Sequence, residues 1–147
     1  MLVGIDDLSF YTANFSLDLQ ELAAHNGSDA AKYTVGIGQE RMSVPGADED
    51  VVTMAANASV PLIAGMKKRG EDPSLIRTIL FATETGIDQS KAAGVYLHSL
   101  LRLSPRCRVV ELKQACYSAT AALQLACAWV ARKPKEKVLV IASDIAR

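Results

Sequence analysis

The residue best suited to covalent chemistry in this chain is a cysteine between a predicted strand and a predicted helix. Cys116 follows a short β-type run, 107–110, and precedes an Ala-rich apolar run, 121–131, that predicts a helix. Unpaired backbone N–H groups and the positive end of the helix dipole would face a thiol at this position. That field favours the thiolate, which is the nucleophilic form. A small cysteine packed in the core like alanine has the same pattern, so position alone leaves both interpretations open.

A second candidate is the carboxylate of Glu84. The stretch 76–83 is rich in apolar residues and predicts a largely buried strand, which Glu84 directly follows. Proteins of the α/β class usually keep their chemistry at the carboxyl ends of strands. Desolvation there would make the carboxylate a stronger general base. A solvated loop glutamate or a helix cap fits the same position, and because most glutamates are exposed, the residues alone favour that simpler interpretation.

The composition is typical of a soluble globular protein. The chain has 147 residues, 50% hydrophobic and 22% charged, which is enough for one domain with a sizeable core. Its 16 basic residues balance 16 acidic ones, and no basic run is long enough to predict binding to nucleic acid or to an anionic membrane. No apolar run approaches the roughly 20 residues of a membrane span, and the N-terminus lacks the features of a signal peptide.

The cysteines and histidines indicate neither a disulfide scaffold nor a metal site. Cys107, Cys116 and Cys127 are an odd number without framework spacing, so we expect a reducing cytoplasm. The sequence has neither a C-x-x-C pair nor a histidine pair at metal-ligand spacing. His25 and His98 stand far apart, and we expect His98 to be a half-buried structural residue.

The hydrophobic pattern predicts strands alternating with helices, which implies an α/β sheet covered by helices. We expect Asp29 to be the N-cap of a short helix, and Pro61 to kink or split a longer one. The predicted strands are 2–5, 76–83, 107–110 and 138–142, and the predicted helices are 17–24, 29–33, 48–70, 89–103 and the run that ends near Ala131.

The glycines of the stretch 36–41 invite comparison with a dinucleotide-binding loop. Arg41 stands where the third glycine of that fingerprint belongs, and a clear strand-to-helix context is absent. A turn in which the glycines adopt positive φ is the better interpretation.

Four short stretches together resemble one family: ACYSAT at 115–120, FATETGID at 81–88, GIGQ at 36–39 and VLVIASD at 138–144. They resemble the N-terminal part of 3-hydroxy-3-methylglutaryl-CoA synthases of the bacterial type, which are members of the thiolase-fold superfamily. The resemblance runs from Gly4 to Arg147, and the cysteine and glutamate stretches together make it specific. It implies an α/β, thiolase-like N-terminal half with a mixed sheet and a buried central helix after the cysteine. Residues 1–147 would then be one half-domain of a longer synthase.

The resemblance also implies an activity. Cys116 would take the acetyl group of acetyl-CoA as a thioester, and Glu84 would remove a proton from its methyl group for attack on acetoacetyl-CoA. Asp29 and Ala30 match positions that contribute to the acyl-CoA site, although helix capping explains Asp29 equally well. The family implies a homodimer of the mevalonate pathway in which CoA thioesters are substrates and no cofactor is used. It also uses a histidine from the second half, whose motif neither histidine here matches.

Three alternatives remain open. A polyketide-pathway synthase that adds a β-branch would keep both Cys116 and Glu84 and use substrates bound to a carrier protein. A ketoacyl synthase or thiolase relative would share the cysteine before a helix and lack the glutamate stretch. A non-enzymatic half-domain would serve only as a folding or dimerisation partner.

Overall fold

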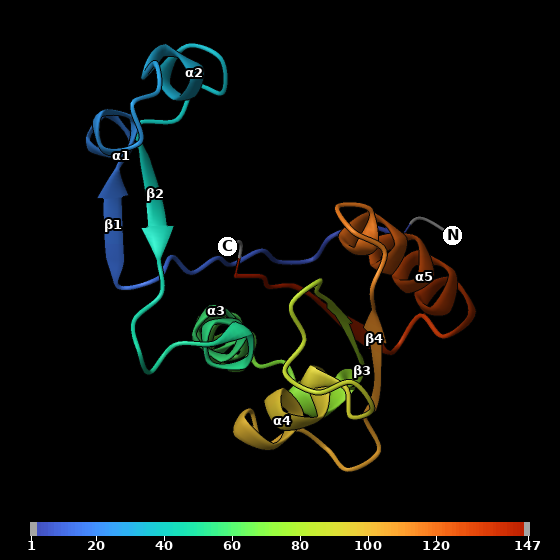
Figure 1. Ribbon diagram of the computed structural model, residues 1–147. Helices are drawn as coiled ribbons and strands as arrows, with labels where there is room; N and C mark the ends of the chain where they lie inside the picture. The colour runs from blue at the N-terminus through green and yellow to red at the C-terminus, as the bar shows by residue number, and fades with distance from the viewer. Residues whose placement is uncertain (1–2, 146–147) are drawn as a thin grey trace. The chain divides into compact units, whose positions relative to one another are not determined.

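A computed structural model describes residues 3–145 of the chain (Figure 1). The chain forms two compact units. The larger unit joins Met1–Tyr11 to Asp50–Arg147, and the smaller unit is Thr12–Glu49.

The larger unit is built on a three-stranded parallel sheet in the order β4-β3-β5. Its strands are β3 (Ile76–Ala82), β4 (Arg108–Leu112) and β5 (Lys137–Ala142), close to the predicted positions. The central strand β3 is almost wholly buried, which explains its nearly continuous apolar sequence. Ala82 pairs with Leu112 on one side and with Ala142 on the other, so the three strands end at the same level.

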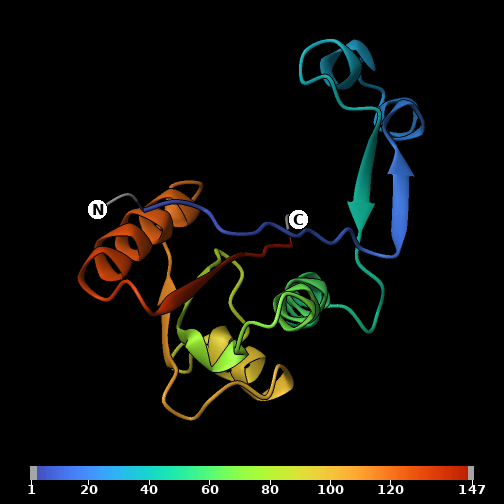
Figure 2. The ribbon, with the colours of Figure 1, turned by 180° about the vertical axis from the view of Figure 1, so that it is seen from behind.

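Helices cover both faces of this sheet. The helices α3 (Val51–Lys68) and α4 (Ala93–Leu100) share a core cluster with Ile79 and Phe81, whereas α5 (Ser118–Arg132) packs around Leu80. Because successive side chains of a strand point to opposite faces, the two clusters lie on opposite sides of β3. Figures 1 and 2 show this arrangement from two sides. Within residues 3–145, no helix is both long and apolar enough to cross a bilayer.

The helix α5 is buried on one face only. Ser118, Ala122 and Ala126 are its buried residues, whereas Leu123 and Leu125 expose 41% and 38% of their surface. The helix predicted at 121–131 is therefore present and longer at its N-terminus. Within residues 3–145, the packed cluster of α5 lies on its face toward β3.

Clear capping signals define both ends of α3. Asp50 caps it in a capping box, in which its Oδ1 accepts from the Thr53 N–H at 2.7 Å while the Thr53 hydroxyl accepts from the Asp50 N–H at 2.7 Å. At the other end, Gly70 adopts φ +75°, and the N–H of Glu71 donates to the carbonyl of Met66. The helix therefore begins after Asp50 rather than at residue 48.

Pro61 does not split α3, so one of the two predicted effects of this proline is absent. The helix runs through Pro61 from Val51 to Lys68. Proline leaves the carbonyl of Asn57 without its helical donor. Both Pro61 and Asn57 are exposed, so water can satisfy that carbonyl.

The helix α4 is shorter than the predicted span 89–103. Residues 86–92 have no helical structure, and the side chain of Asp88 accepts backbone bonds from Ser90 and Lys91 instead. The chain turns after Leu100, and Arg102 has φ +49°. Two apolar residues of α4 are exposed, Val95 at 39% and Leu100 at 56%.

The smaller unit contains a hairpin that the sequence pattern does not predict. The strands β1 (Phe15–Asp18) and β2 (Arg41–Val44) pair in antiparallel fashion. The helix α1 (Leu19–His25) begins two residues after the predicted start, because Asp18 caps it through the N–H groups of Gln20 and Glu21. The turn before β2 contains Gly38 at φ +72°, as predicted, whereas Gly36 does not adopt positive φ.

The short helix α2 (Ala31–Thr34) lies between α1 and β2. It begins two residues after the predicted start at Asp29, whose Oδ1 accepts from the N–H of Ala31 at 2.9 Å. Ala30 is the N-cap residue and has no capping side chain. Asp29 therefore caps this helix from the preceding position, which confirms a local structural role for its carboxylate.

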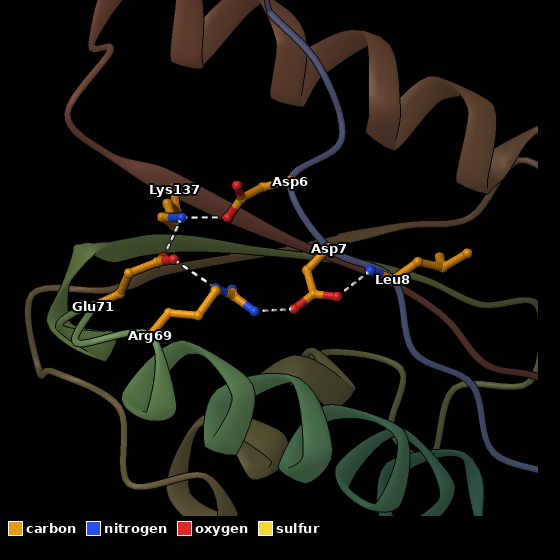
Figure 3. A network of polar contacts seen from close by, with 6 residues as sticks. All are labelled: Asp6, Asp7, Leu8, Arg69, Glu71 and Lys137. Carbon is orange, nitrogen blue, oxygen red and sulfur yellow. Dashed lines mark hydrogen bonds and ion pairs between the residues drawn. The ribbon is translucent and has the colours of Figure 1, made fainter.

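The N-terminal segment of the larger unit is held by ion pairs rather than by strand pairing. Residues 3–10 have no regular secondary structure, so the strand predicted at 2–5 is absent over its described part, and Leu2 lies outside the described residues. Figure 3 shows the charged network that anchors this segment.

Five side chains form this network: Asp6, Asp7, Arg69, Glu71 and Lys137. Arg69 bonds Asp7 at 2.9 Å and Glu71 at 2.7 Å, and Lys137 bonds Glu71 at 2.6 Å as well as Asp6. The Arg69 guanidinium holds the pKa values of both Asp7 and Glu71 below their ordinary range. The carboxylates of Asp6 and Glu71 raise the pKa of Lys137. The network thereby joins the N-terminal segment to the end of α3 and the start of β5.

We predict that Gly94→Ala destabilises the larger unit, because α4 approaches the sheet closely at this residue. A Cβ atom there would lie 2.7 Å from Cγ1 of Val109 and 3.3 Å from Cβ of Phe81. Overpacking of this kind costs about 1–3 kcal/mol, partly offset by up to about 1 kcal/mol from the better helix propensity of alanine. Urea unfolding should show a lower free energy of unfolding, whereas Gly4→Ala, which meets nothing within 4 Å, should be neutral. Equal stability of the two variants would contradict this packing.

Candidate active site

The carboxyl ends of the parallel strands form one edge, and both predicted catalytic residues follow strands that end there. Glu84 comes after β3 and Cys116 after the neighbouring β4. Backbone bonds extend the register beyond the strands: the N–H of Thr83 donates to Leu112 at 3.1 Å, and that of Ser143 donates to Ala82 at 3.2 Å. This edge is where parallel α/β sheets usually bind ligands.

Cys116 lies in a tight turn between β4 and α5. The preceding Ala115 has φ +48°, a conformation that a residue with a Cβ rarely adopts. The hydroxyl of the buried Ser118 accepts from the N–H of Gln114 at 2.6 Å, which ties the start of the turn to the first residue of the helix. The N–H of Ser118 in turn donates to Ala115 at 3.0 Å. Local bonds thus hold the cysteine in place.

The surroundings of Cys116 match the prediction of a thiol before a helix. Cys116 is exposed, and α5 begins two positions later at Ser118. The N-cap Tyr117 makes no side-chain capping bond, so its side chain leaves the first N–H groups of α5 uncapped. The positive end of a 15-residue helix therefore begins directly after the cysteine turn.

Glu84 lies in a turn that one carboxylate oxygen holds. Oδ1 of Asp144, just after β5, accepts from the N–H of Glu84 at 2.6 Å and from the N–H of Thr85 at 3.1 Å. The same oxygen accepts from the hydroxyls of Thr83 and Thr85, both at 2.9 Å. The N–H of Ile145 donates back to the Thr85 hydroxyl at 3.1 Å. Asp144 therefore fixes the backbone on both sides of the Glu84 side chain.

Glu84 is exposed, whereas the sequence predicted a desolvated carboxylate at this position. The buried strand ends at Ala82, and Thr83 is the last fully buried residue before the turn. The fixed backbone of Glu84 is the feature that suits it to chemistry.

Sequence reasoning missed Asp144 as a site residue, although a signal was present. Asp144 follows a buried strand in the same way that Glu84 does, and Ser143 and Asp144 end one of the stretches that carry the family resemblance. Only the parallel pairing of β3 and β5 shows that the two turns meet.

The structure does not test the predicted acyl-CoA role of Asp29 and Ala30. Both lie in the smaller unit, where Asp29 is exposed and Ala30 is partly buried at the start of α2. The carbonyl of Ala30 accepts from the Thr34 hydroxyl at 3.3 Å. Their contacts are those of a helix start, and a substrate role stays a prediction.

The remaining cysteines and the central histidine have structural surroundings. Nε2 of the half-buried His98 lies 2.9 Å from the carbonyl oxygen of Ser104, as expected of a structural residue. Cys107 is partly buried, and burial raises the pKa of its thiol. Cys127 is exposed on α5. Among residues 3–145, no cluster of three or more His, Cys, Asp or Glu side chains could hold a metal ion.

Comparison with known proteins decides the family. The family described as "Hydroxymethylglutaryl-coenzyme A synthase N terminal" matches residues 1–147. The chain belongs to this family. A hydroxymethylglutaryl-CoA synthase of Enterococcus faecalis is 44% identical over 147 residues, which are 100% of this chain and 37% of the relative. The polyketide biosynthesis 3-hydroxy-3-methylglutaryl-ACP synthase PksG of Bacillus subtilis is 36% identical over 98% of this chain and 34% of its own length.

Solved structures of hydroxymethylglutaryl-CoA synthases have the same fold. An HMG-CoA synthase complexed with CoA aligns with a TM-score of 0.88 at 40% identity, covering 98% of this chain and 36% of that one. MvaS in complex with 3-hydroxy-3-methylglutaryl coenzyme A aligns with a TM-score of 0.87 at 38% identity. The alignment covers 98% of this chain and 34% of that one. The predicted α/β, thiolase-like fold is thereby confirmed. The chain spans little more than a third of the length of these relatives.

We predict that Cys116 is the fastest-reacting thiol of the full-length protein. Iodoacetamide near neutral pH should modify Cys116 before Cys107, whose thiolate is disfavoured by burial. It should also modify Cys116 before Cys127. Cys127 is exposed as well, but it lies inside α5 rather than before the helix N-terminus. Peptide mapping by mass spectrometry measures the three rates. Labelling of Cys127 at the rate of Cys116 or faster would contradict activation by the helix terminus.

Proposed function

We propose that this chain is the N-terminal half-domain of a longer hydroxymethylglutaryl-CoA synthase. The enzyme is an acyltransferase that condenses acetyl-CoA with acetoacetyl-CoA to give 3-hydroxy-3-methylglutaryl-CoA and CoA. The observation that carries the proposal is the pair of Cys116 before α5 and Glu84 after β3 at one sheet edge, in a chain that matches the family throughout. Neither residue alone would be specific.

In the first half of the reaction, Cys116 forms a thioester. Its thiolate attacks the carbonyl carbon of acetyl-CoA, the bond from that carbon to the CoA sulfur breaks, and the CoA thiolate leaves and takes up a proton. The covalent intermediate divides one difficult step into two easier ones. The backbone N–H of Cys116 is a suitable donor to the developing oxyanion. CoA thioesters are the substrates, and the proposal requires no cofactor.

In the second half, Glu84 acts as the general base. Its carboxylate takes a proton from the methyl group of the acetyl-cysteine, and the resulting carbon nucleophile attacks the ketone of acetoacetyl-CoA. The new alkoxide takes up a proton, and water then cleaves the thioester to release the product and free Cys116. The backbone bonds from Asp144 support this role, because a general base must be held at a fixed position to reach its proton.

The remaining family properties belong to the same proposal. Asp29 and Ala30 contribute to the acyl-CoA site, and the protein acts as a cytoplasmic homodimer in the mevalonate pathway of isoprenoid synthesis. The solved relatives with bound CoA and 3-hydroxy-3-methylglutaryl coenzyme A support CoA thioesters as ligands of the family.

A second candidate function is β-branching in polyketide synthesis. PksG is 36% identical, and the HMG synthase of the curacin biosynthetic pathway, solved in complex with an acetyl donor-ACP, aligns with a TM-score of 0.89 at 36% identity. Both candidates use Cys116 and Glu84 in the same way and differ in the carrier of the acyl group. The higher identity to the Enterococcus enzyme favours CoA. Comparing acetyl transfer to Cys116 from acetyl-CoA and from acetylated carrier protein separates the two.

We predict that Glu84→Ala and Cys116→Ala fail at different steps in the full-length protein. Cys116→Ala should lose both acetylation and condensation, because it removes the nucleophile. Glu84→Ala should still be acetylated by acetyl-CoA, whereas condensation should fall by about 10²–10⁴-fold through loss of the general base. Intact mass counts acetylated protein, and the loss of acetoacetyl-CoA absorbance measures condensation.

The control for this experiment is Glu136→Ala, which removes a carboxylate just before β5, at the opposite end of the sheet. It should retain both steps. If Glu84→Ala condenses at nearly the wild-type rate, Glu84 is a structural carboxylate. If Glu84→Ala is not acetylated, Glu84 supports the cysteine turn and the assigned separation of roles is wrong.

A further inference from the structure

A carboxylate on the strand that leads to Cys116 caps the helix that follows Glu84. Oε2 of Glu111, near the end of β4, accepts from the backbone N–H of Ala93 at 2.6 Å. Ala93 is the first residue of α4, and its N-cap Ala92 has no side chain that can cap the helix. Glu111 therefore supplies the missing cap from a residue 18 positions away in the sequence.

The other oxygen of this carboxylate lies against the turn after Glu84. A Cβ atom placed on Gly86 would lie 2.9 Å from Oε1 of Glu111 and 3.7 Å from Cγ2 of Thr83. The backbone at Gly86 thus packs directly beside the carboxylate, in a space that a larger residue would fill. Glu111 consequently contacts the connection between β3 and α4 near its beginning and at its end.

This connection has little other structure to hold it in place. Residues 83–92 contain no helix or strand and are mostly exposed. Asp144 holds the backbone at Glu84 and Thr85, and Asp88 bonds only to its near neighbours Ser90 and Lys91. Glu111 therefore attaches the part beyond Thr85 to the sheet.

We infer that Glu111 is a positioning residue that fixes the Glu84 turn relative to the strand leading to Cys116. A charged acceptor at 2.6 Å makes a strong hydrogen bond. Glu111 also pairs with Phe81 in the register of β4 with β3, so its own backbone is fixed by the sheet. The inference rests on the proposed function, because it assigns Glu111 a role in the step for which Glu84 is the base.

The test compares two substitutions of Glu111 in the full-length protein. Glu111→Ala removes both contacts, and condensation should fall by about 10–100-fold, the size of effect that a small misplacement of a catalytic group produces. Acetylation of Cys116 should continue, because the contacts of Glu111 lie on the Glu84 side. Glu111→Gln keeps an oxygen acceptor of the same shape and should restore most of the condensation rate. Glu136→Ala serves as the control for loss of a carboxylate elsewhere in the unit.

A second variant tests the same contact without removing the carboxylate. Gly86→Ala places a methyl group against Oε1 of Glu111 and should lower condensation in the same direction while leaving acetylation intact. Amide hydrogen exchange at Ala93 provides a readout that does not depend on activity. Exchange should be faster in Glu111→Ala and remain slow in Glu111→Gln.

The outcomes separate this inference from the proposed function. Unchanged exchange at Ala93, equal losses of acetylation and condensation, or failure of Glu111→Gln to restore condensation would each overturn the positioning role. A wild-type protein whose Cys116 is never acetylated would contradict the proposed function and the catalytic part of this inference. The exchange experiment would then still decide whether Glu111 holds Ala93.

Discussion

The parallel pairing of β3 with both of its neighbours is the constraint on which the site depends. β3 is buried on both faces, so its register with β4 and β5 is fixed by two sets of packed side chains as well as by the ladder. A shift of one residue would turn Leu80 toward α4 and Phe81 toward α5. Because all three strands end level, the turns that follow them lie along one edge.

Two carboxylates hold the backbone of the segment after β3 through hydrogen bonds. Asp144 accepts hydrogen bonds from the backbone on both sides of the Glu84 side chain, and Glu111 reaches the N-terminus of α4. Both acidic residues come from the neighbours of β3 rather than from β3 itself. The turn that carries Glu84 is therefore held by groups whose own positions the sheet determines. The cysteine turn, in contrast, is held by bonds within its own segment, through Gln114, Ala115 and Ser118.

The sequence predicted the features that depend on local signals. The apolar run of β3 and the cysteine before α5 each have a signature within a few residues, and each is present. The hairpin of β1 and β2 was missed because its strands have only four residues each and bury little surface. The helix predicted at 89–103 is too long at both ends, because Asp88 holds Ser90 and Lys91 in a turn and the chain turns after Leu100.

The features that were missed depend on pairing between distant segments. The hydrogen bond from the Glu84 N–H to Asp144 joins residues 60 positions apart, and no periodicity in the sequence indicates it. The continuity of α3 through Pro61 depends on solvent access to one carbonyl, which is a property of the folded helix.

The central claim is that the sheet edge brings Glu84 and Cys116 to the same acyl group. Crosslinking with a short bifunctional thiol reagent tests it most directly, in full-length protein carrying Cys107→Ser and Cys127→Ser. The account predicts that Glu84→Cys in this background is crosslinked to Cys116, whereas Glu136→Cys is not. If Glu84→Cys fails to crosslink although both thiols react with a monofunctional reagent, or if Glu136→Cys crosslinks equally well, the two groups do not share one site.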